Sequence, residues 1–220
     1  MQHMALEMYR NEKDKEYTLF TQDLLKQADI NISNIDVEAR EVTPEEAKPL
    51  PFGIFLNFGI PAKQVEYKVT TAHSIKGKDG NLKEYPLLLN DESLGTQQLF
   101  TFGPILKQAL DSGKTIFIDE IEKSLHPFIV KYLISIFRNN NINKNGAQLI
   151  VTTHETTLLS LDTFRRDQIY FTEKTKETGI TKLYSLDEYP VRKTENIEKG
   201  YLMGRYGAIP YLTCDKEVFN

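Results

Sequence analysis

The chain has 220 residues, 40% of them hydrophobic, which is enough for a buried core in one large domain or two small ones. Its 27 basic and 31 acidic side chains give a formal net charge of -4, which excludes a chain-wide attraction to nucleic acid or anionic membranes. The lone cysteine, Cys214, has no partner for an internal disulfide, and no apolar run approaches the roughly 20 residues of a membrane span. We therefore expect a cytoplasmic protein without a membrane partner.

The first 60 residues predict helices, a strand and a linker. Apolar side chains at helical spacing predict one or two helices over residues 5–28, but no capping residue precedes Leu6. Truncation and a frayed terminus both explain that uncapped start. Alternating apolar residues in 30–37 predict a strand interrupted by a turn, and four prolines within 44–61 predict a loop or linker.

From residue 65 the pattern becomes regular. Residues 65–70 alternate as a strand does, and "KGKDGN" predicts a hairpin turn after it. A helix follows with an apolar face that includes Leu99 and Leu110; Pro104 is expected to bend or shorten it, and Gly113 to end it.

Two apolar runs then flank a second helix. "TIFID" at 115–119 and "AQLIVTTH" at 147–154 predict parallel strands buried on both faces, and the helix between them begins at Pro127. A strand pair over 167–174 and 180–186 and a helix near 194–203 complete the chain. The predicted fold class is α/β, with a parallel sheet core and flanking helices.

The triplet Gly113-Lys114-Thr115 is not a phosphate-binding P-loop. That motif, G-x-x-x-x-G-K-[ST], would require glycine at position 108, where the chain has Gln108. The triplet also follows a helix and precedes a strand, the reverse of the order that points backbone amides at a phosphate. It is interpreted as the end of a helix, and no other segment of the 220 residues matches the motif.

Three polar side chains follow the two predicted parallel strands, where ligands bind in open α/β sheets. Asp119 and Glu120 follow the first strand, and His154 follows the second. An aspartate at this edge can bind Mg²⁺, the next carboxylate can activate water, and an imidazole can donate to phosphate. The alternative is that all three are simply solvent-facing strand ends.

Three segments resemble a known class in order and spacing: "NDESLGTQQL", "TIFIDEIEKSLHP" and "QLIVTTHETTLL". They resemble the signature, Walker B with D-loop, and switch-histidine segments of ABC-class ATPases. Within that class they are similar to the RecF/SMC-like branch found in bacterial AAA-type ATPases of abortive-infection and overcoming-lysogenization systems. The resemblance covers roughly residues 85–212, and the segment 165–210 also resembles the C-terminal part of the abortive-infection ATPases.

The resemblance implies a role for each matching residue. Asp119 would bind Mg²⁺, Glu120 would be the general base and His154 would sense the γ-phosphate. The residues that would contact the γ-phosphate held by a partner subunit are Ser93, Gly95 and Thr96. Leu94 and Thr96 depart from transporter signatures, and Ser93 has the alternative role of a plain helix cap. His126 stands at a D-loop position, where it would either communicate across a dimer interface or cap the next helix.

The resemblance also implies what lies outside these residues. The family's P-loop and Q-loop belong to an N-terminal lobe, so residues 1–60 would be the remnant of an insertion or arm, and 61–220 the C-terminal lobe of a P-loop NTPase-like fold. ATP and Mg²⁺ would bind only with that lobe, in a homodimer, and the chain alone would be inactive. It would drive phage defence, with a nucleic acid or effector protein as a possible partner.

Two rival functions remain open at this stage. The first is a metal-dependent hydrolase or nuclease, whose ligands would be Asp119, Glu120, Glu122, His126 and His154. The second is a non-catalytic docking module of a split ATPase, for which Tyr201, Tyr206 and Tyr211 could pack against a partner, although core packing explains these tyrosines more simply.

Overall fold

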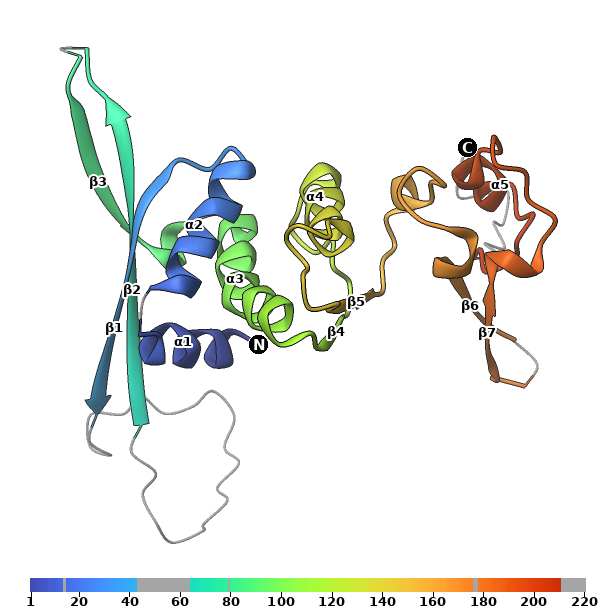
Figure 1. The fold of residues 1–220 in the computed structure, drawn as a ribbon, viewed down its shortest axis with the longest axis horizontal. Coiled ribbons are helices and arrows are strands. Elements are labelled where there is room, and N and C mark those ends of the chain that lie inside the picture. The colour runs from blue at the N-terminus through green and yellow to red at the C-terminus, as the bar shows by residue number, and fades with distance from the viewer. Residues whose placement is uncertain (14, 43–63, 79, 176–177, 211–220) are drawn as a thin grey trace, which may run out of the picture.

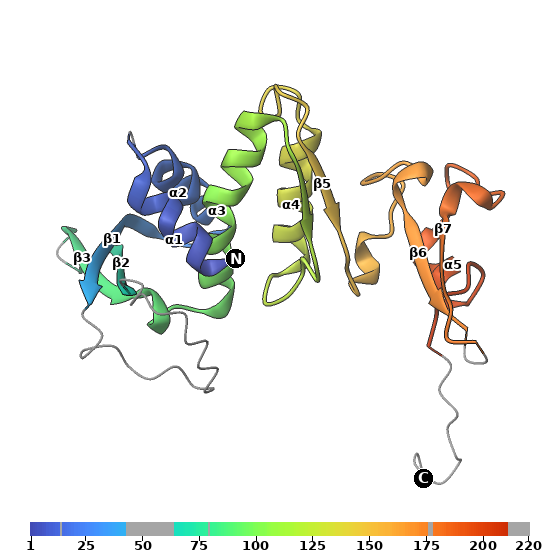
Figure 2. The ribbon, with the colours of Figure 1, turned by 90° about the horizontal axis from the view of Figure 1, so that it is seen from below.

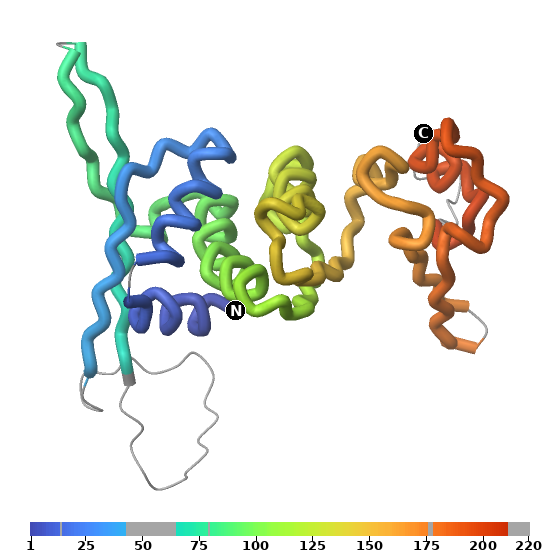
Figure 3. The backbone as a smooth tube through the Cα atoms, in the orientation of Figure 1, coloured from blue at the N-terminus to red at the C-terminus, as the bar shows by residue number. Residues whose placement is uncertain are grey.

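The computed structural model describes residues 1–13, 15–42, 64–78, 80–175 and 178–210. Its elements follow one another along the longest axis, from an antiparallel sheet at one end to a small mixed unit at the other (Figures 1 and 3). The described α-helices are α1 Gln2–Asn11, α2 Glu16–Gln27, α3 Leu94–Ser112, α4 Pro127–Arg138 and α5 Ile197–Leu202. None of these helices is both long and apolar enough to cross a bilayer.

The largest sheet is antiparallel, in the order β1 (Ile32–Val42), β2 (Gln64–Lys76) and β3 (Leu82–Leu88). The predicted interruption of the first strand is only a register irregularity between Ile32 and Asn34, so β1 is longer than its apolar pattern suggested. The hairpin prediction is confirmed, because β2 and β3 pair across it. The predicted domain boundary after residue 60 and its proline-rich linker lie outside the described residues, and β1 and β2 pair from either side of it.

Helices α1 and α2 pack against both the sheet and α3, which confirms the prediction of helices over residues 5–28 (Figure 2). Gly103 lets α2 and α3 approach closely, since a Cβ atom there would lie 1.8 Å from the Thr21 hydroxyl oxygen. A single cluster of buried apolar side chains runs from α1 through α3 to α4. Helix α3 is therefore packed on both sides.

Pro104 neither ends nor shortens α3, which continues for 19 residues. A proline has no N–H, so the carbonyl of Phe100, four residues earlier, loses its helical donor. The hydroxyl of Tyr9, from α1, donates to this carbonyl at 2.8 Å. Tyr9 is 3% exposed and its ring stacks on Phe100, and burial raises the pKa of the Tyr9 phenol. A side chain from α1 thus completes the backbone hydrogen bonding of α3.

The parallel core is smaller than predicted. Only β4 (Thr115–Ile118) and β5 (Gln148–Val151) are parallel, and the other described sheets are antiparallel. Only one face of each strand packs against the core: Ile118 is 4% exposed and Leu149 and Val151 are half-buried, whereas Phe117 is 72% and Ile150 is 47% exposed. The prediction of strands buried on both faces is therefore wrong for the described residues, because the core cluster that includes α4 covers a single face.

A second, separate core holds the C-terminal unit together. Strands β6 (Tyr170–Lys174) and β7 (Thr181–Ser185) pair antiparallel, as predicted, and α5 forms within the predicted helical range. Tyr206 is fully buried and stacks on Phe171, and Tyr201 also stacks on Phe171. These two tyrosines are core residues, and Tyr211 lies outside the described residues.

The Tyr9 hydroxyl can be tested by a double-mutant cycle. Tyr9→Phe should lower the free energy of unfolding by about 1–3 kcal/mol, because it leaves the Phe100 carbonyl buried without a donor. In a Pro104→Ala background the restored N–H of residue 104 should donate to this carbonyl. Tyr9→Phe should then lower the free energy of unfolding by clearly less than it does with Pro104 present. Urea unfolding of the four proteins measures both values. Equal costs in the two backgrounds would show that the hydroxyl does not replace the missing N–H.

Tyr184 makes the stability of the C-terminal unit depend on alkaline pH. Burial, followed by the charge of Glu173 and the nearby Tyr189, raises the pKa of Tyr184 to about 12, and its hydroxyl donates to the Tyr206 carbonyl at 2.7 Å. An unfolded tyrosine ionises near pH ~10, so this contribution should be complete below that pH and should disappear as pH rises towards 12. The free energy of unfolding, measured by denaturation at pH 8 and at pH 11, should fall less between these two pH values in Tyr184→Phe than in the wild type.

Candidate functional site

The ends of β4 and β5 are joined by the hydroxyl of Thr152. Its Oγ1 donates to Asp119 Oδ1 at 2.5 Å and accepts the backbone N–H of Glu120 at 2.8 Å. The parallel register, with Ile118 opposite Val151, places these residues side by side. Both carboxylates remain exposed to solvent. One hydroxyl therefore contacts both the carboxylate of the candidate metal ligand Asp119 and the backbone of the candidate catalytic residue Glu120.

The backbone reverses direction immediately after this edge. Glu120 has φ +49° and Ser124 has φ +61°, both in the left-handed region that non-glycine residues seldom occupy. The N–H of Ile121 donates to the Thr152 carbonyl at 3.1 Å, so the turn continues to follow β5. This turn points the Glu120 side chain away from the strand and towards His154.

His154 lies above the same edge. Its Nε2 is 3.7 Å from Glu120 Oε1, and its side chain is 87% exposed. Its backbone N–H donates to Glu122 Oε1 at 2.8 Å. Burial would raise the pKa of Glu122, but the hydrogen bonds from the His154 backbone, the Thr153 side chain and its own backbone together outweigh burial, so the pKa lies below its usual value. Sequence reasoning considered Glu122 only as a metal ligand and missed this positioning contact.

The turn at the start of α3 meets the turn after β4. Ser93 caps the helix, as its Oγ accepts the Thr96 N–H at 3.1 Å and lies 2.8 Å from the Thr96 hydroxyl. Thr96 is 3% exposed. A Cβ atom on Gly95 would lie 2.8 Å from the Ser124 carbonyl oxygen, so only glycine allows this close approach. The helix-cap role of Ser93 is therefore present, and its role towards phosphate stays a prediction.

A carboxylate that sequence reasoning missed anchors the α3 turn to the antiparallel sheet. Glu92 Oε1 accepts the Thr71 hydroxyl at 2.5 Å and lies 2.7 Å from His73 Nε2. Both partners come from β2, and the Glu92 side chain is only 7% exposed. The Glu92 carbonyl also accepts from the Gln97 amide at 2.9 Å. The sheet thereby holds the residue that precedes Ser93.

His126 belongs to a different surface. Its Nδ1 accepts the Phe128 N–H at 3.2 Å, so it caps α4, which is one of the two roles expected for it. Its place in a dimer interface stays a prediction. Within the described parts of the chain, no three His, Cys, Asp or Glu side chains are grouped closely enough to hold a metal ion. The five-ligand set of the metal-hydrolase alternative is therefore not assembled there.

The hydroxyl of Thr152 should be necessary for this geometry. Thr152→Val keeps the side-chain shape but removes the hydroxyl, whereas Thr152→Ser retains it. Loss of one hydrogen bond should speed amide exchange at Glu120 by roughly fivefold to tenfold in the valine variant. The serine variant should stay within about twofold of the wild type. Unchanged protection in the valine variant would show that the strand ends are held by other contacts.

The sequence that carries these residues matches a known protein family. The family model AAA_21, described as "AAA domain, putative AbiEii toxin, Type IV TA system", matches residues 9–160. The match runs from α1 past His154 and so includes every candidate site residue, while β6, β7 and α5 lie beyond it. A search of curated proteins found no match. Since the match covers more than half of the chain, the protein belongs to the AAA_21 family of AAA domains.

Proposed function

We propose that Asp119, Glu120 and His154 form the hydrolysis side of an ATP site in an ABC-class, RecF/SMC-like member of this family. The observation that carries the proposal is the Thr152 hydroxyl, which holds the Asp119 carboxylate and the Glu120 backbone together at the strand edge. His154 Nε2 lies 3.7 Å from the Glu120 carboxylate. The residues proposed as base, metal ligand and hydrogen-bond donor thus lie on one exposed edge.

Each side chain has a distinct proposed role. The Asp119 carboxylate is a hard oxygen ligand of the kind that Mg²⁺ prefers; one of its oxygens accepts from Thr152, and the group is exposed. Bound Mg²⁺ would neutralise phosphate charge. Glu120 would orient and deprotonate water. His154 would donate to the γ-phosphate, and Glu122 would keep its backbone in place.

The start of α3 is proposed as the contact to nucleotide held by another subunit. Ser93, Gly95 and Thr96 form the first turn, whose positive end favours an anion. The contact between Gly95 and Ser124 places this turn against the loop after β4. Nucleotide binding at the first turn of α3 would therefore affect the loop after β4, and the reverse. We propose on the basis of the resemblance that two copies share nucleotides in a homodimer.

The proposed ATP site also needs a P-loop, although no segment of these 220 residues matches the P-loop motif. We propose that it is supplied by a segment or polypeptide outside them, and that residues 1–60 and 61–220 correspond to an arm and to the C-terminal lobe. The exposed apolar side chains Phe117 and Ile150, on the uncovered face of β4 and β5, support docking of such a polypeptide. A phage-defence role is proposed from the resemblance together with the family description, which names a putative AbiEii toxin. A nucleic acid or effector partner is proposed from the resemblance alone.

The base is tested by Glu120→Gln. ATP turnover should be measured with the P-loop polypeptide present, in the same chain or added to it. Turnover should fall at least about a hundredfold while ATP binding persists, because the amide cannot accept the proton of water. Glu16→Gln, a surface change on α2, serves as the control and should leave turnover unchanged. Turnover near the wild-type rate in Glu120→Gln would remove this residue from the proposed role.

A further inference from the structure

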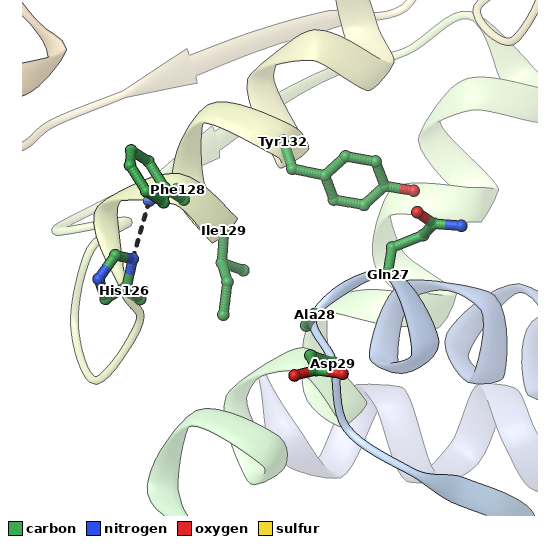
Figure 4. Close-up of a pocket in the computed structure, with 7 residues that line it drawn as sticks. All are labelled: Gln27, Ala28, Asp29, His126, Phe128, Ile129 and Tyr132. Carbon is green, nitrogen blue, oxygen red and sulfur yellow. Dashed lines mark hydrogen bonds between the residues drawn. The ribbon is translucent and has the colours of Figure 1, made fainter.

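A pocket of about 270 Å³ lies between the end of α2 and the start of α4, and Asp119, Glu120 and His154 are not among its lining residues. Figure 4 shows Tyr132 and Ile129 reaching from α4 towards the end of α2. The described residues that line it are Gln27, Ala28, Asp29, His126, Phe128, Ile129 and Tyr132. Ligand pockets typically measure about 300–1,000 Å³, so this one suits a single side chain better than a larger molecule.

One wall of the pocket is negative. Asp29 is the one formally charged residue in that lining set, and among the described residues no hydrogen bond or ion pair engages its carboxylate. It directly follows the C-terminal end of α2, where the helix dipole adds partial negative charge. The Asp29 N–H donates to the Lys26 carbonyl, and the Ile30 N–H donates to the Leu25 carbonyl. These two carbonyls at the end of α2 therefore already have hydrogen-bond donors. The free carboxylate remains available to a cation.

The α4 side of the pocket carries the aliphatic Ile129, two aromatic residues and a hydrogen-bond donor (Figure 4). Phe128 is 72% exposed, and Lys131 Nζ lies 5.9 Å from its ring centre, so a cation already contacts this ring. Tyr132 adds a second ring. His126 Nδ1 accepts the Phe128 N–H, which places the proton of the neutral imidazole on Nε2. That N–H can donate to a peptide carbonyl.

We propose that this pocket binds an arginine side chain of a partner polypeptide. The planar guanidinium can donate two hydrogen bonds to the Asp29 carboxylate and lay its flat face against the apolar side chains of the α4 side, which a lysine ammonium cannot do equally well. The main-chain carbonyl beside that arginine would accept from His126. With no lysine or arginine in the described lining, the pocket does not favour an acidic peptide or a phosphate. This inference is independent of the nucleotide proposal.

The test uses acetyl-arginine amide and its uncharged analogue acetyl-citrulline amide as probes. In NMR titrations of the full chain, the arginine probe should shift the amides of Asp29, Phe128 and Tyr132 saturably. Citrulline should not. Asp29→Asn should weaken arginine binding roughly tenfold through loss of a charge-assisted pair, and asparagine tolerates the positive φ of this position. Asp162→Asn, a second exposed aspartate, should leave binding unchanged.

Three results would overturn the proposal. Equal shifts with citrulline would show that charge is not recognised, and an unchanged affinity in Asp29→Asn would show that this carboxylate is not the partner. Shifts at the same amides that grow with protein concentration alone would assign the pocket to a second copy of the chain. Asp29→Gly is a second variant that checks for misfolding. Glycine accepts the positive φ without strain, so this variant should keep the native spectrum and should also lose arginine binding.

Discussion

Helix α3 depends on a hydrogen bond that comes from outside it. The missing N–H of Pro104 leaves the Phe100 carbonyl without its helical donor, and the Tyr9 hydroxyl takes that place. The helix begins at the Ser93 turn and ends at Gly113, directly before β4. It therefore connects the sheet that anchors Glu92 to the strand that carries Asp119. An unbroken α3 therefore fixes the position of the Ser93 turn relative to the end of β4.

The acidic residues of the site form two groups, which differ in the contacts that their carboxylates make. Glu92 and Glu122 are used internally, the first against Thr71 and His73 and the second against the His154 backbone. Asp119 and Glu120 are exposed and are fixed through Thr152, so their remaining oxygens face solvent. Half-buried carboxylates thus position the backbone and exposed ones keep free oxygens, which is the arrangement expected of a preorganised site.

The sequence predicted the local features well and the long-range ones poorly. The end of α3 at Gly113, the start of α4 at Pro127 and the β6–β7 pair depend on neighbouring residues, and all were confirmed. The extent of the parallel core was wrong, because an apolar run does not reveal that Phe117 will be left exposed. The link between Tyr9 and Phe100 joins residues 91 positions apart, and no periodicity encodes such a contact. The roles proposed for the site residues remain predictions.

The left-handed backbone at Glu120 limits how mutations there can be interpreted. With φ at +49°, the position tolerates glycine, asparagine and aspartate far better than branched residues, whatever the chemistry of the side chain. A valine would strain the turn and shift Ile121, which is fully buried. Loss of function in such a variant would report on folding as much as on proton transfer. Only substitutions that keep the unbranched stem, or that accept positive φ, separate the conformational demand of this residue from its chemical one.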